Sequence, residues 1–224
     1  MRLIDTHSHL FLEEFSEDLP QVIERARSAG VTHIFMPNID STTIDSMLSV
    51  CNTYNDYCFP MIGLHPTSVN ADYEKELEIV ARELRSFNKY IAIGEVGMDL
   101  YWDKTFLKEQ QIVLDKQINW ALEYDLPVVI HCRDAFGYIY NVLEPYKNTS
   151  LKGVFHSFTG TDDEAARILE FSGFLIGING VVTFKKSRLP EVLTKIPLEK
   201  IVLETDSPYL TPVPNRGKRN ESAY

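Results

Sequence analysis

Short runs of apolar and β-branched residues alternate along the chain with longer stretches of helical periodicity. The eight apolar runs cover residues 2–7, 31–37, 59–65, 90–95, 127–132, 153–158, 174–180 and 201–206. The stretches with helical spacing between them cover residues 18–30, 42–54, 73–87, 106–124, 135–146, 163–173 and 188–196. Strands that alternate with helices predict parallel βαβ units, and near-continuous apolar strands favour a sheet covered on both faces. The chain is therefore predicted to adopt an α/β fold, a closed (β/α)₈ TIM barrel.

The alternating pattern stops after the eighth apolar run. The remaining residues read SPYLTPVPNRGKRNESAY, which leaves little or no sequence for a helix after the last strand. We therefore expect the final outer helix to be missing, with exposed apolar surface over the first and last strands. No linker or repeat divides the sequence, so we expect residues 1–224 to form one barrel domain.

Composition places the chain among ordinary globular proteins, with 44% hydrophobic and 24% charged residues. No apolar run approaches the length of a membrane span, and the N-terminal residues resemble neither a secretory signal nor a transit peptide. The three cysteines form no CxxC pair, which suits reduced thiols. We expect a cytoplasmic protein without membrane contacts, and nothing in the sequence implies an obligatory protein partner.

The net charge excludes one class of function. With 22 basic and 32 acidic residues, the formal charge is −10. Such a chain should repel a polyanion, because nucleic-acid affinity depends mainly on neutralising phosphates. This argues against a passive nucleic-acid-binding module. It does not argue against an enzyme whose bound metal ions supply positive charge locally.

Histidines and two carboxylates fall where predicted strands end. These residues are His7 and His9, His65, Glu95, His131, His156 and Asp206, at the ends of predicted strands one, three, four, five, six and eight. Barrel enzymes carry their chemistry at the carboxyl ends of the strands. Five of the six histidines are therefore expected on one rim. The sixth, His33, lies early in strand two and is expected to be a packed or surface residue.

The HxH spacing of His7 and His9 favours joint binding of one metal ion, because residues i and i+2 of a strand point to the same face. Imidazole suits zinc and similar ions, and carboxylates also accept magnesium or manganese. With His131 and His156, the set has enough ligands for two divalent ions. Glu95 is the better candidate to bridge them, and Asp206 could ligate one ion while taking a proton from water. This chemistry is hydrolysis.

Two further carboxylates share strand faces with these residues. Asp5 lies two positions before His7, and Glu204 two positions before Asp206. Either carboxylate could orient a ligand by hydrogen bonding.

Six sequence blocks occur in order along nearly the whole chain. They are IDTHSHL at 4–10, GLHP at 63–66, GEVGMD at 94–99, IHCRDA at 130–135, HSFTG at 156–160 and ETDSPYL at 204–210. Together they resemble the signature blocks of the TatD family of metal-dependent deoxyribonucleases. The resemblance implies a TIM barrel of the amidohydrolase-like group, a divalent metal site and phosphodiester hydrolysis on DNA.

The resemblance also implies residue roles. The implied metal ligands are His7, His9, Glu95, His131, His156 and Asp206. His65, in the GLHP block, would face the same pocket and hold a substrate phosphate or a leaving oxygen. Asp206, Glu95 and His65 are thus the expected catalytic residues. The segment PNRGKRNE is similar to the family's basic loop after strand eight, which would place Arg216, Lys218 and Arg219 near the pocket mouth as backbone anchors or as a solvated loop.

Substrate contacts are less well defined by the residues themselves. Arg133, two positions after His131, offers a planar fork that would suit a phosphate, or a surface salt bridge. Tyr101 and Trp102 follow Asp99 and could offer a stacking face to an unpaired base, or pack the loop.

The leading hypothesis is a cytoplasmic metal-dependent deoxyribonuclease that uses two zinc, magnesium or manganese ions. A confined barrel mouth admits a single-stranded DNA end more easily than a duplex. One alternative is a D-aminoacyl-tRNA deacylase, which would hydrolyse an ester at the same metal site, and the ligand set does not discriminate between them. A second alternative is a catalytically weak binding or scaffold protein, against which the complete ligand set argues.

Overall fold

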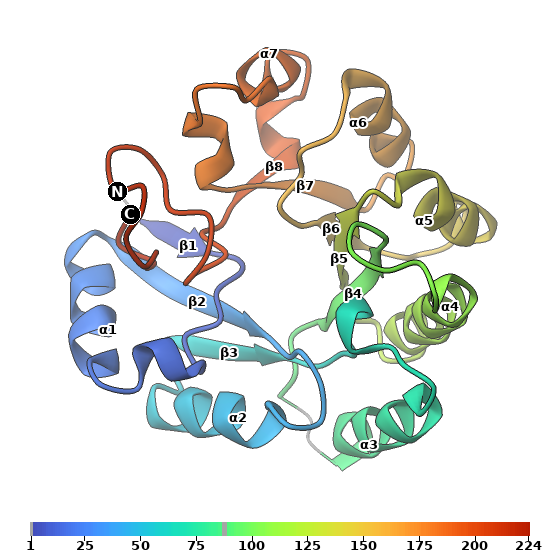
Figure 1. Ribbon diagram of the computed structural model, residues 1–224, viewed down its shortest axis with the longest axis horizontal. Coiled ribbons are helices and arrows are strands. Elements are labelled where there is room, and N and C mark those ends of the chain that lie inside the picture. Colours follow the sequence, from blue (N-terminus) through green and yellow to red (C-terminus); the bar gives the residue numbers. More distant parts are fainter. Residues whose placement is uncertain (1, 87–88) are drawn as a thin grey trace.

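A computed structural model of the protein, which describes residues 2–86 and 89–224, contains eight parallel strands arranged in a ring with helices outside it (Figure 1). The strands are β1 (Leu3–Asp5), β2 (Val31–Pro37), β3 (Cys58–Met61), β4 (Ile93–Asp99), β5 (Val128–Arg133), β6 (Gly153–Phe155), β7 (Phe174–Ile178) and β8 (Ile201–Leu203). The predicted α/β barrel is confirmed.

Each of the first seven strands is followed by an α-helix. The helices are α1 (Leu19–Ser28), α2 (Ile44–Thr53), α3 (Tyr73–Ser86), α4 (Leu107–Glu123), α5 (Phe136–Leu143), α6 (Asp162–Leu169) and α7 (Leu189–Leu193). Residue 87, the last position of the helix expected at 73–87, lies outside the described residues. None of the helices in the described ranges combines the length and apolarity that a membrane crossing requires.

Amphipathic spacing and local caps explain why these segments are helical. In α1, Val22, Ile23 and Ala26 lie on one face and are buried against the strands. Helix α6 begins with a capping box, in which Thr161 and Glu164 each accept a hydrogen bond from the other's backbone N–H. The main apolar core lies between these inner helix faces and the strands.

Backbone hydrogen bonds close the ring at two seams. The strands pair in the orders β1-β2-β3 and β4-β5-β6-β7-β8. At the first seam, Gly94 donates to the Ile62 carbonyl over 2.9 Å. At the second seam, Thr6 donates to the Leu203 carbonyl over 3.1 Å and His9 to that of Ser207 over 2.8 Å. The first and last strands of the chain therefore lie side by side.

Several strands differ in extent from their predicted runs. β3 ends at Met61 rather than at residue 65, and the predicted strand end at His65 instead precedes a 3₁₀ turn at Pro66–Ser68. Proline has no N–H to donate to a strand ladder, so the turn begins there. β4 starts later than predicted and continues through Asp99. This extension carries the GEVGMD block along one strand.

No helix follows β8 in the described residues up to Tyr224, as the sequence predicts. A groove remains over β1 and β8, lined by apolar side chains that include Leu3, Ile4, Val182 and Leu203. Ile4 is 44% exposed and Leu203 55% exposed. The expected exposed apolar surface is therefore present.

The segment after β8 returns to α1 and is held there by ion pairs (Figure 1). The Arg219 guanidinium donates to both oxygens of Asp18, over 2.7 and 2.8 Å, and Arg25 pairs with Glu221 over 2.7 Å. The buried Asn220 amide donates to the carbonyls of Thr205 and Tyr209. These contacts fasten the last residues of the chain beside β1.

The Asp18 pair provides a pH-dependent test of this attachment. Hydrogen bonds from Arg219 lower the pKa of Asp18 from 3.8 to about 2. Because the folded-state value lies below the unfolded one, the contribution is complete above the unfolded pKa and is lost as pH falls through the folded pKa. We expect Asp18→Asn to lower the free energy of unfolding by about 1 kcal/mol at neutral pH.

Urea unfolding across a pH series checks this expectation. The difference between wild type and Asp18→Asn should shrink as pH falls from about 4 to about 2. Asp72→Asn is the control, because Asp72 pairs with Lys75 on an exposed helix turn and should have little effect. A difference that does not change with pH would contradict the assignment.

Candidate metal centre

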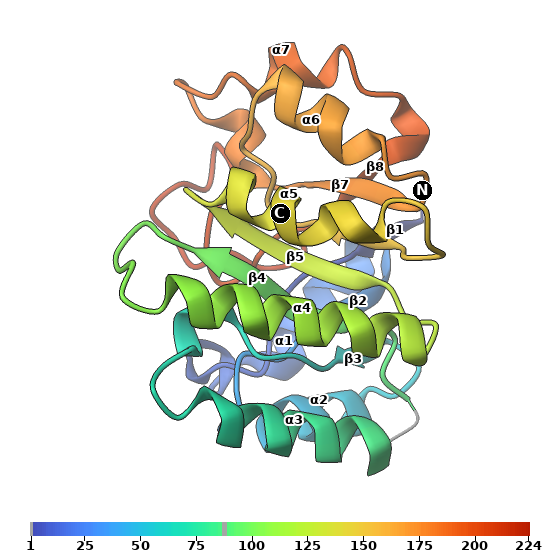
Figure 2. The ribbon, with the colours of Figure 1, turned by 90° about the vertical axis from the view of Figure 1, so that its right-hand side faces the viewer.

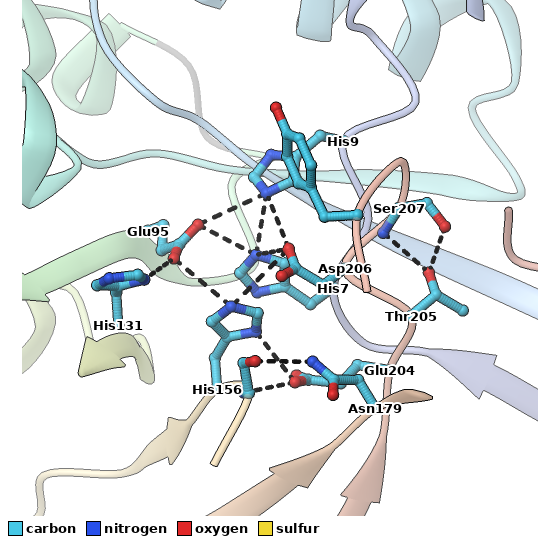
Figure 3. Close-up of polar contacts among 12 residues, drawn as sticks. His7, His9, Glu95, His131, His156, Asn179, Glu204, Thr205, Asp206 and Ser207 are labelled. Carbon is cyan, nitrogen blue, oxygen red and sulfur yellow. Dashed lines mark hydrogen bonds and ion pairs between the residues drawn. The ribbon is translucent and has the colours of Figure 1, made fainter. Parts of the chain in front are cut away.

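A cluster of histidines and carboxylates lies at the carboxyl ends of the strands (Figure 3). The structure brings together His7, His9, His65, Glu95, His131, His156 and Asp206. They come from the segments at or just after β1, β3, β4, β5, β6 and β8. All the side chains expected from the sequence as ligands therefore share one location. Their roles as ligands stay predictions.

The backbone around His7 and His9 explains their convergence. β1 ends at Asp5, yet Ser8 donates to the Phe35 carbonyl over 3.0 Å and His9 to Ser207 over 2.8 Å. The segment therefore stays paired to both neighbours, and residues 7 and 9 keep the shared face of an extended chain. As a result, the two Nε2 atoms lie 3.3 Å apart.

Glu95 is the hub of the cluster and is 2% exposed. Its Oε2 lies 3.1 Å from His7 Nε2 and 3.6 Å from His9 Nε2. Its Oε1 lies 3.0 Å from His131 Nδ1 and 3.6 Å from His156 Nε2. His65 Nε2 also lies 3.3 Å from Oε1. The two oxygens of one carboxylate thus face different sets of imidazole nitrogens.

Asp206 lies on the more open side of the cluster, with 14% of its side chain exposed. Its Oδ1 lies 3.5 Å from His9 Nε2 and 3.9 Å from the Nε2 atoms of His7 and His156. The residue has a φ of 58°, and its N–H donates to the His7 carbonyl. This conformation turns the chain after β8 so that the carboxylate faces the histidines.

Burial and charge act in opposite directions on these groups. Burial would raise the pKa of Glu95, but His65, His7 and His156 with the hydrogen bond to His131 hold that pKa well below its usual range. Burial would lower the pKa of His156, but Glu204, Glu95 and Asp206 raise it to about 10. The histidines therefore stabilise the charged form of the buried Glu95 carboxylate.

The donor set fits divalent cations. Three overlapping groups each place their ligand atoms within 4.8 Å of one another: His7, His9 and Glu95; His7, His156 and Asp206; His65, Glu95 and His131. The Nδ1 atoms of His7 and His9 are buried without a hydrogen-bond partner among the described residues, while both Nε2 atoms face the carboxylates. Imidazole nitrogens and carboxylate oxygens aimed at one point suit zinc, manganese or magnesium.

Two carboxylates contact histidines of the cluster at the ring nitrogen that points away from Glu95. Asp99 Oδ2 lies 2.9 Å from His131 Nε2, and Glu204 Oε1 lies 3.1 Å from His156 Nδ1. In each case the opposite ring nitrogen faces Glu95. The Asp99 contact is a hydrogen bond that fixes the tautomer of His131, whereas the Glu204 contact is an ion pair. This role of Asp99 was not predicted from the sequence. The sequence pattern could have predicted this role, because residues 95 and 99 of β4 lie on the same face of the strand.

The third carboxylate, Asp5, acts on the backbone rather than on an imidazole. It accepts from the N–H of Thr205 over 2.9 Å, from the Thr205 hydroxyl over 2.7 Å and from the N–H of His7 over 3.3 Å. Asp5 therefore ties the HxH segment to the segment that carries Asp206.

The hydrogen bonds of His65 determine which of its two ring nitrogens carries the proton. The Thr67 backbone N–H, which can only donate, points to His65 Nδ1 over 3.1 Å. Nδ1 is thus an acceptor, and the neutral ring carries its proton on Nε2, 3.3 Å from Glu95 Oε1. Burial lowers the pKa of His65, which favours this neutral form. A ring with a proton on its inward nitrogen suits donation to a substrate oxygen better than metal ligation.

The expected substrate residues lie around the cluster in different settings. The Arg133 guanidinium lies 3.8 Å from the centre of the Tyr101 ring, and that of Arg216 lies 3.8 Å from the Phe184 ring. Both arginines are exposed, and their phosphate contacts stay predictions. Arg219 instead pairs with Asp18, so its charge is already matched.

A parallel α/β barrel with a histidine and carboxylate cluster at its carboxyl rim is the arrangement of metal-dependent hydrolases. The family model described as "TatD related DNase" matches residues 4–224. The chain belongs to this family, as the six sequence blocks predict.

Individual relatives agree with this assignment. The chain is 38% identical to the uncharacterized metal-dependent hydrolase YabD of Bacillus subtilis, over 99% of this chain and 86% of the relative. It is 32% identical to the 3'-5' ssDNA/RNA exonuclease TatD of Pantoea ananatis, over 99% of this chain and 87% of that protein. The crystal structure of YjjV, a TatD homologue of Escherichia coli, superposes with a TM-score of 0.90 at 32% identity, over 99% of this chain and 85% of that one.

The contact between Asp99 and His131 provides a test of the centre that does not need a substrate. We expect Asp99→Asn to weaken binding of Zn²⁺ or Mn²⁺ by about 10-fold to 100-fold, because His131 loses the carboxylate that orients it. Isothermal titration calorimetry on chelator-treated protein measures this affinity. Asp103→Asn is the matched control, since Asp103 is exposed in the same loop and bonds only to Thr105 among the described side chains. Equal affinities for wild type and Asp99→Asn would exclude the orienting role.

Proposed function

We propose that the protein is a nuclease that hydrolyses phosphodiester bonds of single-stranded DNA, with two divalent metal ions held by His7, His9, Glu95, His131, His156 and Asp206. The observation that carries this proposal is the geometry of Glu95. Its Oε2 faces His7 and His9, and its Oε1 faces His131 and His156. A carboxylate between two sets of imidazoles is suited to bridge a pair of ions.

The substrate class is supported by the family and by the relative from Pantoea ananatis, which carries the name 3'-5' ssDNA/RNA exonuclease. The charge of the chain makes bound cations necessary for this substrate. A net charge of −10 repels a phosphate backbone unless cations are bound where the strand must approach. Binding of the strand and binding of the metal are therefore expected to be coupled.

Divalent ions, when bound, polarise phosphate oxygens and lower the pKa of water. The chain's own groups supply the proton transfers. Asp206 Oδ1 faces three histidines, which leaves Oδ2 to accept the proton of the attacking water. As the water oxygen bonds to phosphorus, the bond from phosphorus to the leaving sugar oxygen breaks. Asp206 then returns the proton to that oxygen.

His65 and the arginines position the substrate in this scheme. The proton on His65 Nε2 points into the cluster, where it can be donated to an oxygen of the reacting phosphate. Thr67 fixes that orientation through its backbone N–H. Arg133 is the last residue of β5, and Arg216 lies in the segment after β8. The N–H groups of both guanidinium groups are suited to phosphates of the strand.

We expect hydrolysis of labelled single-stranded DNA by the purified protein with Mg²⁺, Mn²⁺ or Zn²⁺, and no hydrolysis with excess chelator. Asp206→Asn should lower kcat on the order of 10³-fold, because the proton acceptor is lost. Asp125→Asn is the control, since Asp125 pairs with Lys152 in an exposed turn just before β5, at the opposite end of the barrel. Full activity of Asp206→Asn would show that the nuclease is a contaminant.

A parallel set of substrates tests the bond that is cleaved. Single-stranded DNA, single-stranded RNA, duplex DNA and D-aminoacyl-tRNA are each incubated with the metal-loaded protein. Metal-dependent release of nucleotides from the single strands is the expected result. Turnover of the aminoacyl ester alone would overturn the nuclease proposal and favour the deacylase alternative.

A further inference from the structure

Two aromatic side chains stand exposed beside the metal centre. Tyr101 is 49% exposed and Trp102 79% exposed. They follow β4 directly, in the segment that projects beyond the strand ends toward α4 (Figure 2). Large aromatic side chains ordinarily bury most of their surface, so an open tryptophan at the rim of a site is informative. We call Tyr101 and Trp102 the rim aromatic pair.

The rim aromatic pair is linked to the cluster through Asp99. The Tyr101 N–H donates to Asp99 Oδ1 over 3.1 Å, and Asp99 Oδ2 lies 2.9 Å from His131 Nε2. One carboxylate therefore contacts both the first residue of the pair and a candidate metal ligand. The backbone of the pair is therefore tied to the candidate metal centre through one side chain.

Arg133 holds the geometry of the pair. Its guanidinium carbon lies 3.8 Å from the centre of the Tyr101 ring and 5.8 Å from that of Trp102. The two rings are nearly perpendicular, at 88°, with centroids 4.6 Å apart. Asp99 and Arg133 are register partners of adjacent strands, so the stack is fixed by the sheet. The guanidinium occupies a face of Tyr101 and leaves the Trp102 surface open.

We propose that the rim aromatic pair stacks an unpaired nucleobase of the substrate strand, with Trp102 as the open face. The proposal deepens the proposed function and rests on it. Every base presents a π-face, and a base inside a duplex has both faces covered by its neighbours. The pair would therefore select single strands without selecting sequence.

The local charges favour a base rather than a phosphate at this position. Asp103 follows Trp102 and Asp134 follows Arg133, and both carboxylates are exposed. Asp99 is also adjacent, and it lowers the net positive charge around Arg133. These three carboxylates offset the charges of Arg133 and of the exposed Lys104, so the surface beside Trp102 has no excess positive charge to hold a phosphate, whereas an uncharged ring can stack there.

Fluorescence tests the stacking without requiring turnover. The chain has two tryptophans, so Trp120→Phe leaves Trp102 as the only one. In this variant, with the metal ligands unchanged and loaded with Zn²⁺, a short oligothymidine strand with hydrolysis-resistant linkages should quench the emission. A strand of equal length made of abasic deoxyribose phosphate should quench much less. Equal quenching by the two strands would overturn the proposal.

Kinetics of the metal-loaded enzyme give a second readout. Wild type should prefer the base-bearing strand over the abasic strand on the order of 10-fold in kcat/KM. Trp102→Ala should bring this ratio close to one, and Trp102→Phe should restore most of it. Tyr124→Ala, an exposed tyrosine at the end of α4 on the opposite rim, is the matched control. A ratio unchanged in Trp102→Ala would contradict the stacking role.

The two proposals fail in distinguishable ways. Absence of hydrolysis of every strand, together with base-dependent quenching, would reject the nuclease and retain the stacking surface. Hydrolysis with no preference for bases would retain the nuclease and reject the stacking surface. Thermal unfolding of each variant separates loss of fold from loss of contact, and little change is expected because Trp102 is 79% exposed.

Discussion

The buried carboxylate of Glu95 is the interaction on which the rest of the structure depends. A charge that is 2% exposed is tolerated only if groups of opposite sign or hydrogen-bond donors surround it. Those groups come from β1, β5 and β6, which lie far apart in the chain, and only a closed ring brings them to β4. The barrel brings the histidines to Glu95. The histidines in turn offset the cost of burying the Glu95 carboxylate inside the barrel.

The alternation of side chains in extended segments explains how much of the centre was predictable. His7 and His9 converge because residues i and i+2 share a face, and Glu95 and Asp206 meet them because parallel strands end on one rim. The exact strand ends were not predictable. β1 has only three residues, and the extension of its segment depends on hydrogen bonds to Phe35 and Ser207.

Residue roles that depend on partners far away in the chain could not be predicted from the sequence either. Arg216 and Arg219 are close in one basic segment, yet Arg219 pairs with Asp18, 201 residues earlier, while Arg216 covers Phe184. Likewise, the proton of His65 depends on the direction of the Thr67 backbone N–H. Such assignments need the relative positions of loops, which local periodicity does not encode. The resemblance to a family indicates which residues gather, and the structure shows which of their atoms face each other.

The seam between β1 and β8 has a consequence for how the protein matures. During synthesis the N-terminal residues leave the ribosome first, so His7 and His9 are made long before Thr205 and Asp206. The hydrogen bonds that hold these segments together, from Thr6 to Leu203 and from Thr205 to Asp5, form only when almost the whole chain is available. Closure of the ring is thus expected late in folding, because it joins residues that are far apart in the sequence. A chain interrupted before Asp206 lacks the complete cluster, so the candidate metal centre can assemble only after β8 and the residues that follow it have been made.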